Sequence, residues 1–176
     1  MNETGVRAST HLHGRASWPV GAIAGLAGGA AEVGWIVIYQ NLVGRESGAV
    51  ARGITQSVIS DLVTAPAAVP LGVAIHMVLA ILLGVVIASL VSRLLPRIVG
   101  TAMEPVVVVL TLVGVWAVNF LVVLPVINPD FVALVPYGAS LASKVLFGFA
   151  AAFVFSCAHR FRAAGNEDRR EANHVQ

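Results

Sequence analysis

The sequence contains little charge and almost no cysteine. Only 11% of its 176 residues are Asp, Glu, Lys or Arg, whereas a soluble domain is about one quarter charged. Cys157 is the only cysteine, which excludes an internal disulfide and every zinc motif built from paired cysteines. The net charge of +2 is small, and the basic residues do not cluster with aromatic residues. We therefore expect no binding of nucleic acid.

Motifs for several other chemistries are also missing. The closely spaced glycines that begin at Gly21 lie inside one apolar run, so they do not form a nucleotide-binding loop between a strand and a helix. His76 is the only histidine well inside an apolar run. A haem, which commonly takes two axial His or Met ligands, would need the His76 of a second copy. We expect no metal and no cofactor, with a haem shared by a dimer as the remaining alternative.

Long hydrophobic runs are what the sequence does contain, since 57% of its residues are hydrophobic. The hydrocarbon core of a bilayer is about 30 Å thick and needs around 20 apolar residues at a rise of 1.5 Å each. Four segments qualify, at about 18–42, 69–91, 105–124 and 136–158. The sequence therefore predicts an all-α integral membrane protein, with four transmembrane helices that form two hairpins.

The first loop, at about residues 44–68, has a pattern of its own. Between Val50 and Leu62 its apolar residues recur at helical spacing, with polar residues between them. This pattern is typical of an amphipathic helix that lies on the membrane interface. We expect such a helix on the outer face, and a lid over a site is the functional alternative for the same segment.

The distribution of positive charge predicts the orientation in the membrane. Four spans place both termini and the middle loop on one side, which carries eight Lys or Arg residues against two, Arg45 and Arg52, on the other. Because the positive side faces the cytoplasm, we expect a multi-pass protein of the plasma (inner) membrane with residues 1–17 and 159–176 as cytoplasmic tails. The second tail is expected to be poorly ordered from Ala163 onward. The eight residues are Arg7, Arg15, Arg93, Arg97, Arg160, Arg162, Arg169 and Arg170.

Three ionisable residues, Glu32, His76 and Lys144, lie inside the predicted spans. On insertion scales, one charged side chain at the centre of a span costs about 2.5–3.5 kcal/mol, so its presence there needs an explanation. At 1.5 Å per residue all three fall within about 10 Å of the midplane, toward the outer side, and Asn119 of the third span is at a similar level. Since a buried charge needs an opposite charge, we predict an ion pair of Glu32 with Lys144, completed by His76 and Asn119.

Small residues share the helix faces of these ionisable residues. Residues four apart stack on one face of a helix, and membrane helices contact each other through small residues. Rows of small residues at this spacing share a helix face with Glu32, His76 and Lys144, and therefore direct these three residues toward the interior of the bundle. Ser140 belongs to the row of Lys144, and Tyr137 lies one turn above it. The predicted positions of helix packing are Gly21, Gly25, Gly28, Gly72, Ala80, Gly84 and Gly148.

The polar layer leaves two functions open. In the first, the chain is a small transport protein or proton relay that uses the layer. In the second, it is an accessory or anchor subunit of a larger membrane complex, and the layer only fixes packing. We expect the lipid bilayer as a partner, together with a homo-oligomer or a larger complex. The candidate residues for a substrate or proton relay are Glu32, His76, Asn119, Tyr137, Ser140 and Lys144.

An enzymatic activity is not expected, although one pair of residues invites the question. Ser140 and Lys144 lie one turn apart, and a neutral Lys beside a Ser can activate it as a nucleophile. Glu32 would keep Lys144 charged, however, and no oxyanion-stabilising feature accompanies the pair. We therefore assign no catalytic residue.

Overall fold

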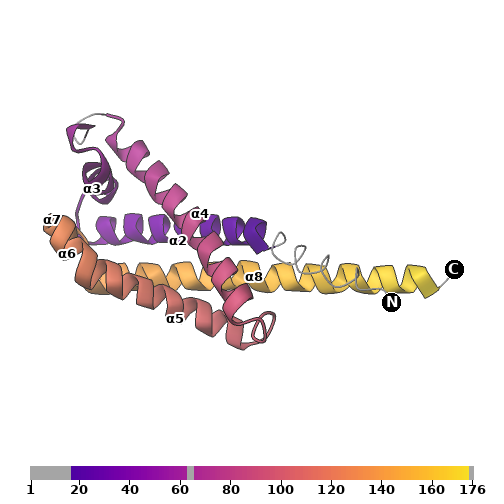
Figure 1. The fold of residues 1–176 in the computed structure, drawn as a ribbon. Coiled ribbons are helices and arrows are strands. Elements are labelled where there is room, and N and C mark those ends of the chain that lie inside the picture. The colour runs from indigo at the N-terminus through magenta and orange to yellow at the C-terminus, as the bar shows by residue number, and fades with distance from the viewer. Residues whose placement is uncertain (1–16, 63–65, 175–176) are drawn as a thin grey trace, which may run out of the picture.

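The computed structural model describes residues 17–62 and 66–174, which form helices and turns without a strand (Figure 1). Four helical segments are long and apolar enough to cross a membrane. Large apolar side chains such as Leu110 and Phe153 are exposed on their outer surfaces, as expected where lipid covers them. The chain is an all-α membrane protein of four spans, as predicted. Its long helices are α2 (Ser17–Leu42), α4 (Ala68–Leu94), α5 (Met103–Val118) and α8 (Tyr137–His174).

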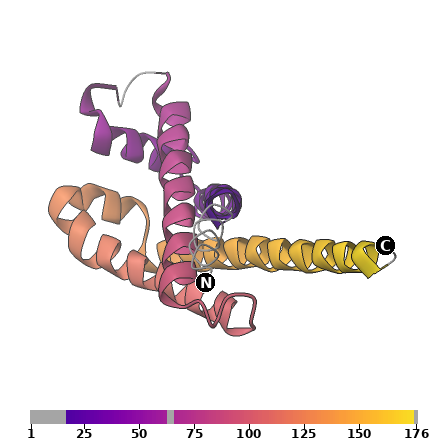
Figure 2. The same cartoon turned by 45° about the vertical axis from the view of Figure 1, so that its right-hand side comes forward.

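The long helices diverge from one end of the bundle to the other. α2 packs against both α4 and α8, and α5 packs against α8. Figure 1 shows α4 crossing α2, and in Figure 2 α2 is seen end-on while α8 runs across the view. A tight turn joins α4 to α5, where Gly100 has a φ of 77°, a conformation that favours glycine. From this turn α4 and α5 separate, as both views show (Figure 2). We call the end with this turn the terminal end of the bundle, and the opposite end the α3 end.

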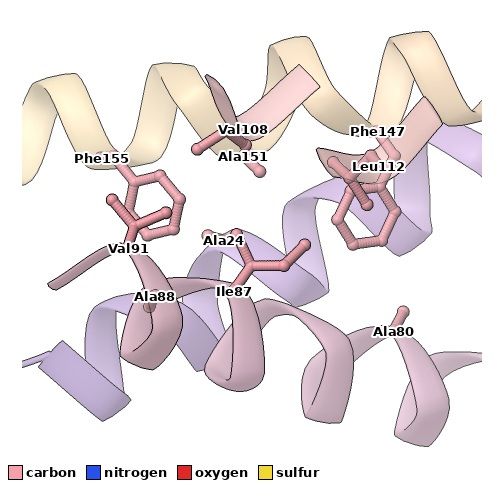
Figure 3. Packing of buried hydrophobic residues seen from close by; sticks show 10 residues of the cluster. All are labelled: Ala24, Ala80, Ile87, Ala88, Val91, Val108, Leu112, Phe147, Ala151 and Phe155. Carbon is pink, nitrogen blue, oxygen red and sulfur yellow. The ribbon is translucent and has the colours of Figure 1, made fainter. Parts of the chain in front are cut away.

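A close-packed apolar core fills the terminal half of the bundle (Figure 3). Leu112, Phe147 and Val108 are fully buried at its centre. Glycines bring the backbones of α2 and α4 together: a Cβ on Gly25 would meet the carbonyl oxygen of Ala80. Such close approach is how membrane helices gain dispersion energy without a hydrophobic driving force. The core therefore leaves little room in this half.

The amphipathic helix predicted for the first loop is present as α3 (Ala49–Val58), followed by the short 3-10 helix η1 (Ser60–Leu62). Its buried face includes Val50 and Thr55. The Thr55 hydroxyl donates a hydrogen bond of 2.6 Å to the carbonyl oxygen of Ala68, at the start of α4. Gly72 lies against the carbonyl of Ala51, where no side chain would fit. These contacts hold α3 across the N-terminal part of α4.

The third span changes its helical form before it ends. After α5 comes a π-helical segment, η2 (Asn119–Val123), and then α6 (Leu124–Ile127). Within it the Leu124 N–H donates to the carbonyl of Asn119, five residues earlier. Pro125 explains the widened turn, because its ring clashes with a regular helix and it has no N–H to donate. The sequence analysis did not predict this segment.

A further short helix, α7 (Pro129–Leu134), closes the connection to α8. Its N-cap residue Asn128 accepts a hydrogen bond of 3.1 Å from the Phe131 N–H. The amide nitrogen of Asn128 also donates to the Ser57 hydroxyl in α3, at 2.8 Å. Phe131 lies against Gly53 of α3. Thus α3 and α7 contact each other over the α3 end.

The last helix is longer than the sequence analysis expected. We expected little order from Ala163 onward, and this was wrong, because α8 continues to His174. The segment after Arg162 is rich in Ala, Arg and Glu, which favour helix. At the terminal end, the Glu104 carboxylate of α5 accepts a 2.7 Å hydrogen bond from the Gly100 N–H and lies 3.0 Å from Nε2 of His159 in α8. These contacts tie α5 to α8 beside the turn.

Candidate functional site

Glu32 of α2 and Lys144 of α8 form an ion pair inside the bundle, the pair expected from the sequence. Nζ of Lys144 lies 2.8 Å from Oε1 and 2.9 Å from Oε2 of Glu32. Glu32 is only 4% exposed. The ammonium group also lies 5.4 Å from the centre of the Phe147 ring, within the range of a cation–π contact. Both charges are thus stabilised by partners within the protein.

Ser143 is a further partner of Glu32 that the sequence analysis missed. Its hydroxyl oxygen lies 3.2 Å from Oε1 of Glu32 and 2.7 Å from the carbonyl oxygen of Ser140. A hydroxyl has one proton to donate, so it serves one of these acceptors at a time. The spacing of Ser140, Ser143 and Lys144 puts all three on one face of α8. That spacing was the signal that could have identified Ser143.

His76 of α4 completes the group from the other side. Its Nε2 lies 3.6 Å from Oε2 of Glu32, close enough for an ion pair if the ring is protonated but too far for a hydrogen bond. Nε2 is buried and has no hydrogen-bond partner within the described chain. A buried polar atom without a partner costs about 1–3 kcal/mol. His76 therefore has an unused capacity to bind a polar group.

A cavity of about 470 Å³ lies beside these residues. Its volume is in the usual range for small-molecule sites, about 300–1,000 Å³. Residues of α2, α3, α4, η2, α7 and α8 line it, and most of them are Val, Ile, Leu, Phe or Ala. The polar residues that line it in the spans are Glu32, His76, Asn119, Ser140, Ser143 and Lys144.

The remaining predicted candidates have different surroundings. Asn119 of η2 lines the cavity. The Ser140 hydroxyl accepts a hydrogen bond of 2.9 Å from Nε1 of Trp116 and lies 3.0 Å from the carbonyl of Tyr137. Tyr137 is 46% exposed, packs edge-on against Trp116 and is not among the lining residues. Trp116, like Ser143, was missed by the sequence analysis.

The predicted packing residues occupy helix contacts on both sides of the site. Gly21, Gly25 and Gly84 lie where α2 meets α4, and a Cβ on Gly28 would meet the Phe147 ring. Gly148 contacts Val109 of α5. Gly72 instead faces α3, so its small size positions the helix at the α3 end. The full set that meets a neighbouring helix is Gly21, Gly25, Gly28, Gly72, Gly84 and Gly148, with Ala80 buried beside them.

The side chains around the cavity also determine whether it could hold a metal ion. Within residues 17–62 and 66–174, no group of three or more His, Cys, Asp or Glu side chains is placed to hold a metal. Glu32 is already engaged by an ammonium group and a hydroxyl. The arrangement can hold the polar end of a small molecule whose apolar part contacts the rest of the wall.

Comparisons of the chain with known protein families, with curated proteins and with solved structures found no match.

Proposed function

We propose that this protein binds a small solute in its cavity, at the layer of Glu32, His76 and Lys144, and acts as a small-solute transport protein. The observation that carries the proposal is that all three residues line one cavity. Protein interiors are close-packed, so a polar cluster that only fixed helix packing would be enclosed by side chains. Here the ion pair faces open space that has the size of a ligand site.

The apolar core next to the polar layer favours a solute over a proton as the transported species. Between the layer and the terminal end, the interior is filled by the apolar core around Leu112 and Phe147. A proton relay needs a chain of titratable groups or water, whereas a binding site needs a cavity on one side only. The accessory-subunit alternative requires neither, and the experiment below separates it from transport.

The proposed orientation places the cavity toward the outside. Eight basic residues lie on the side of the termini against two near α3, which favours a cytoplasmic terminal end. The α3 end, and with it the cavity, then faces the outer side of the plasma membrane. The solute would be taken up from that side.

The proposal is tested by identifying what stays bound to the protein. The wild-type chain is purified in mild detergent from its host membrane, and retained small molecules are identified by native mass spectrometry. We expect one bound species, which is lost in the double variant Glu32→Gln with Lys144→Met. Glu104→Gln is the matched control, because it alters a buried carboxylate away from the cavity, and it should keep the bound species.

Two results would overturn the proposal. One is a wild-type protein that retains no small molecule even after incubation with a total extract of the host membrane. The other is a folded double variant that retains the same species as wild type, which would make the layer a packing device. Thermal unfolding of each variant establishes that it is folded.

A further inference from the structure

The wall of the cavity restricts the chemistry of the solute. Apart from the polar layer, the spans contribute side chains such as Val33, Val73 and Leu124. A solute that is polar over its whole surface would leave groups unpaired against this wall, at about 1–3 kcal/mol for each. An amphiphile, with one polar end and an apolar body, avoids that cost. The rest of the argument depends on the proposed binding function.

The charges at the layer restrict the polar end. Glu32 and Lys144 neutralise each other, so a charged group on the ligand would be attracted by one of them and repelled by the other, with little net gain. Such a charge would also lose its hydration in the apolar surroundings. Nε2 of His76 is buried, lacks a partner and lies 3.6 Å from Oε2 of Glu32; a turn of the ring that brings Nε2 to the cavity surface would let it exchange a hydrogen bond with a neutral hydroxyl. A hydroxyl suits this position because it both donates and accepts.

Two short helices lie over part of the α3 end of the cavity. α3 and α7 both line the cavity, and they are joined by the hydrogen bond of Asn128 to Ser57 and by the contact of Phe131 with Gly53. The terminal side is filled by the apolar core. Val58 of α3 lines the cavity and is 61% exposed, so the cavity also reaches the surface beside α3, outside the long spans.

The side between α4 and α5 has a different character. The two helices diverge from the Gly100 turn (Figure 2), and the cavity wall includes residues of α4 and of η2, the segment that continues α5. Leu79 of α4 lines the cavity and is also 57% exposed. It lies one turn from His76 within the span, where exposed surface contacts lipid. The cavity therefore reaches the lipid-facing surface beside Leu79.

We infer that the solute is an uncharged, hydroxyl-bearing lipid, which enters from the bilayer between α4 and η2 and places its hydroxyl group beside His76 at the polar layer. A cavity of about 470 Å³ holds a drug-sized portion of such a molecule. Any longer apolar tail stays in the bilayer through the opening beside Leu79. The hydroxyl group supplies the hydrogen bond that Nε2 of His76 lacks.

The test uses three photoreactive probes with one alkyl chain and one diazirine, which differ only in their end group: an alcohol, a carboxylate and a quaternary ammonium. Each is added to the full-length protein in nanodiscs, and the labelled peptides are identified by mass spectrometry. We expect the alcohol to label cavity-lining peptides of α4 and η2 about tenfold more than either charged probe, a factor equal to about 1.4 kcal/mol.

Variants of adjacent residues test the route. Leu79→Trp fills the opening and should reduce labelling by the alcohol about tenfold. Val78→Trp is the matched control, because Val78 is equally exposed at 57% but is not among the lining residues, and it should label as wild type does. His76→Phe keeps a ring without the nitrogen and should lower labelling by the alcohol toward the level of the charged probes.

The outcomes separate this inference from the proposed function. Equal labelling by all three probes, or labelling unaffected by Leu79→Trp, would overturn the lipid inference. If native mass spectrometry still found a bound solute that depends on Glu32 and Lys144, binding would stand and the solute would be of another class. No labelling of the cavity and no bound species would overturn both.

Discussion

Lys144 engages both carboxylate oxygens of Glu32, at 2.8 and 2.9 Å, across the contact of α8 with α2. Removing one partner leaves the other charge buried and alone, which costs about 3–5 kcal/mol, whereas replacing both with neutral residues is often close to neutral. We predict that Lys144→Met lowers the free energy of unfolding much more than Glu32→Gln with Lys144→Met does. Denaturation in mild detergent measures this. A single variant as stable as the double variant would contradict the buried pair.

Two glycines of α2 should respond to alanine with opposite signs. A Cβ at Gly25 meets the backbone of Ala80, whereas nothing lies within 4 Å of a Cβ at Gly34. Gly25→Ala should therefore destabilise the protein by about 1–3 kcal/mol through overpacking. Gly34→Ala should stabilise it by up to about 1 kcal/mol, because alanine favours helix. Thermal unfolding of the two variants checks this, and equal shifts would contradict the packing of α2 on α4.

Pro125 should maintain the π-helical segment that carries Asn119 to the cavity. In Pro125→Ala the N–H returns, and we expect a regular helix through residues 119–124. Amide hydrogen exchange in this segment should then slow, since the ladder of backbone hydrogen bonds becomes continuous. Pro105→Ala is the control, because Pro105 lies in the first turn of α5, where proline is tolerated. Unchanged exchange in Pro125→Ala would assign the segment to another cause.

The orientation of the chain can be tested with cysteine labelling. In a Cys157→Ser background, Glu46→Cys near α3 should react in intact cells with a maleimide that does not cross membranes. Arg97→Cys, in the turn at the terminal end, should react only after the membrane is permeabilised. The prediction follows from the distribution of Lys and Arg. The reverse pattern would place the cavity toward the cytoplasm.

The docking of α3 should depend on Thr55 and little on pH. The Arg52 guanidinium donates a hydrogen bond to Glu46 and holds the pKa of that carboxyl below its ordinary value. A lowered pKa means that the contribution of this pair is present at neutral pH and is lost only as the pH falls below about 4. Both groups are solvated. We therefore expect the protection of α3 amides against hydrogen exchange to be the same at pH 7 and at pH 5, after correction for the intrinsic exchange rate at each pH.

Thr55→Val should have the larger effect on α3. It removes the buried hydrogen bond to Ala68. Amide exchange in α3 should then become faster by the factor that corresponds to a free-energy loss of about 1 kcal/mol. Thr111→Val is the matched control, because its hydroxyl bonds only within its own helix, to the carbonyl of Val107. Faster exchange in α3 for both variants would contradict the role of Thr55.

The four spans and the ion pair could be predicted from the sequence because each involves a large free energy of transfer between water and the bilayer. Twenty apolar residues and a charge in hydrocarbon are strong signals, and they identified the four helices, Glu32 and Lys144. The partner Ser143 was missed because a serine in a membrane helix is not costly enough to attract notice. Its hydroxyl can bond to its own helix, so only the contact with α2 reveals its second acceptor.

The cavity could not be predicted from the sequence, for a different reason. It depends on the angle between α4 and α5 and on the widened turn at Asn119, and helical periodicity does not determine either. The sequence analysis predicted that the third span ends near Leu124. In the structure the helix passes Pro125 through η2 and α6 to Ile127. A change in helical form of this kind re-aims side chains without altering the hydrophobic pattern.

The turn at Gly100 makes α4 and α5 a hairpin that is fixed at one end and can change its opening angle at the other. One end of the α4–α5 hairpin is fixed by the packed core and by the contact of Glu104 with His159, and the other end carries the cavity wall. A small change in the angle at the pivot displaces the far tips the most and the core the least. Bilayer thickness or lateral pressure, which act on helix tilt, would therefore set the width of the opening beside Leu79.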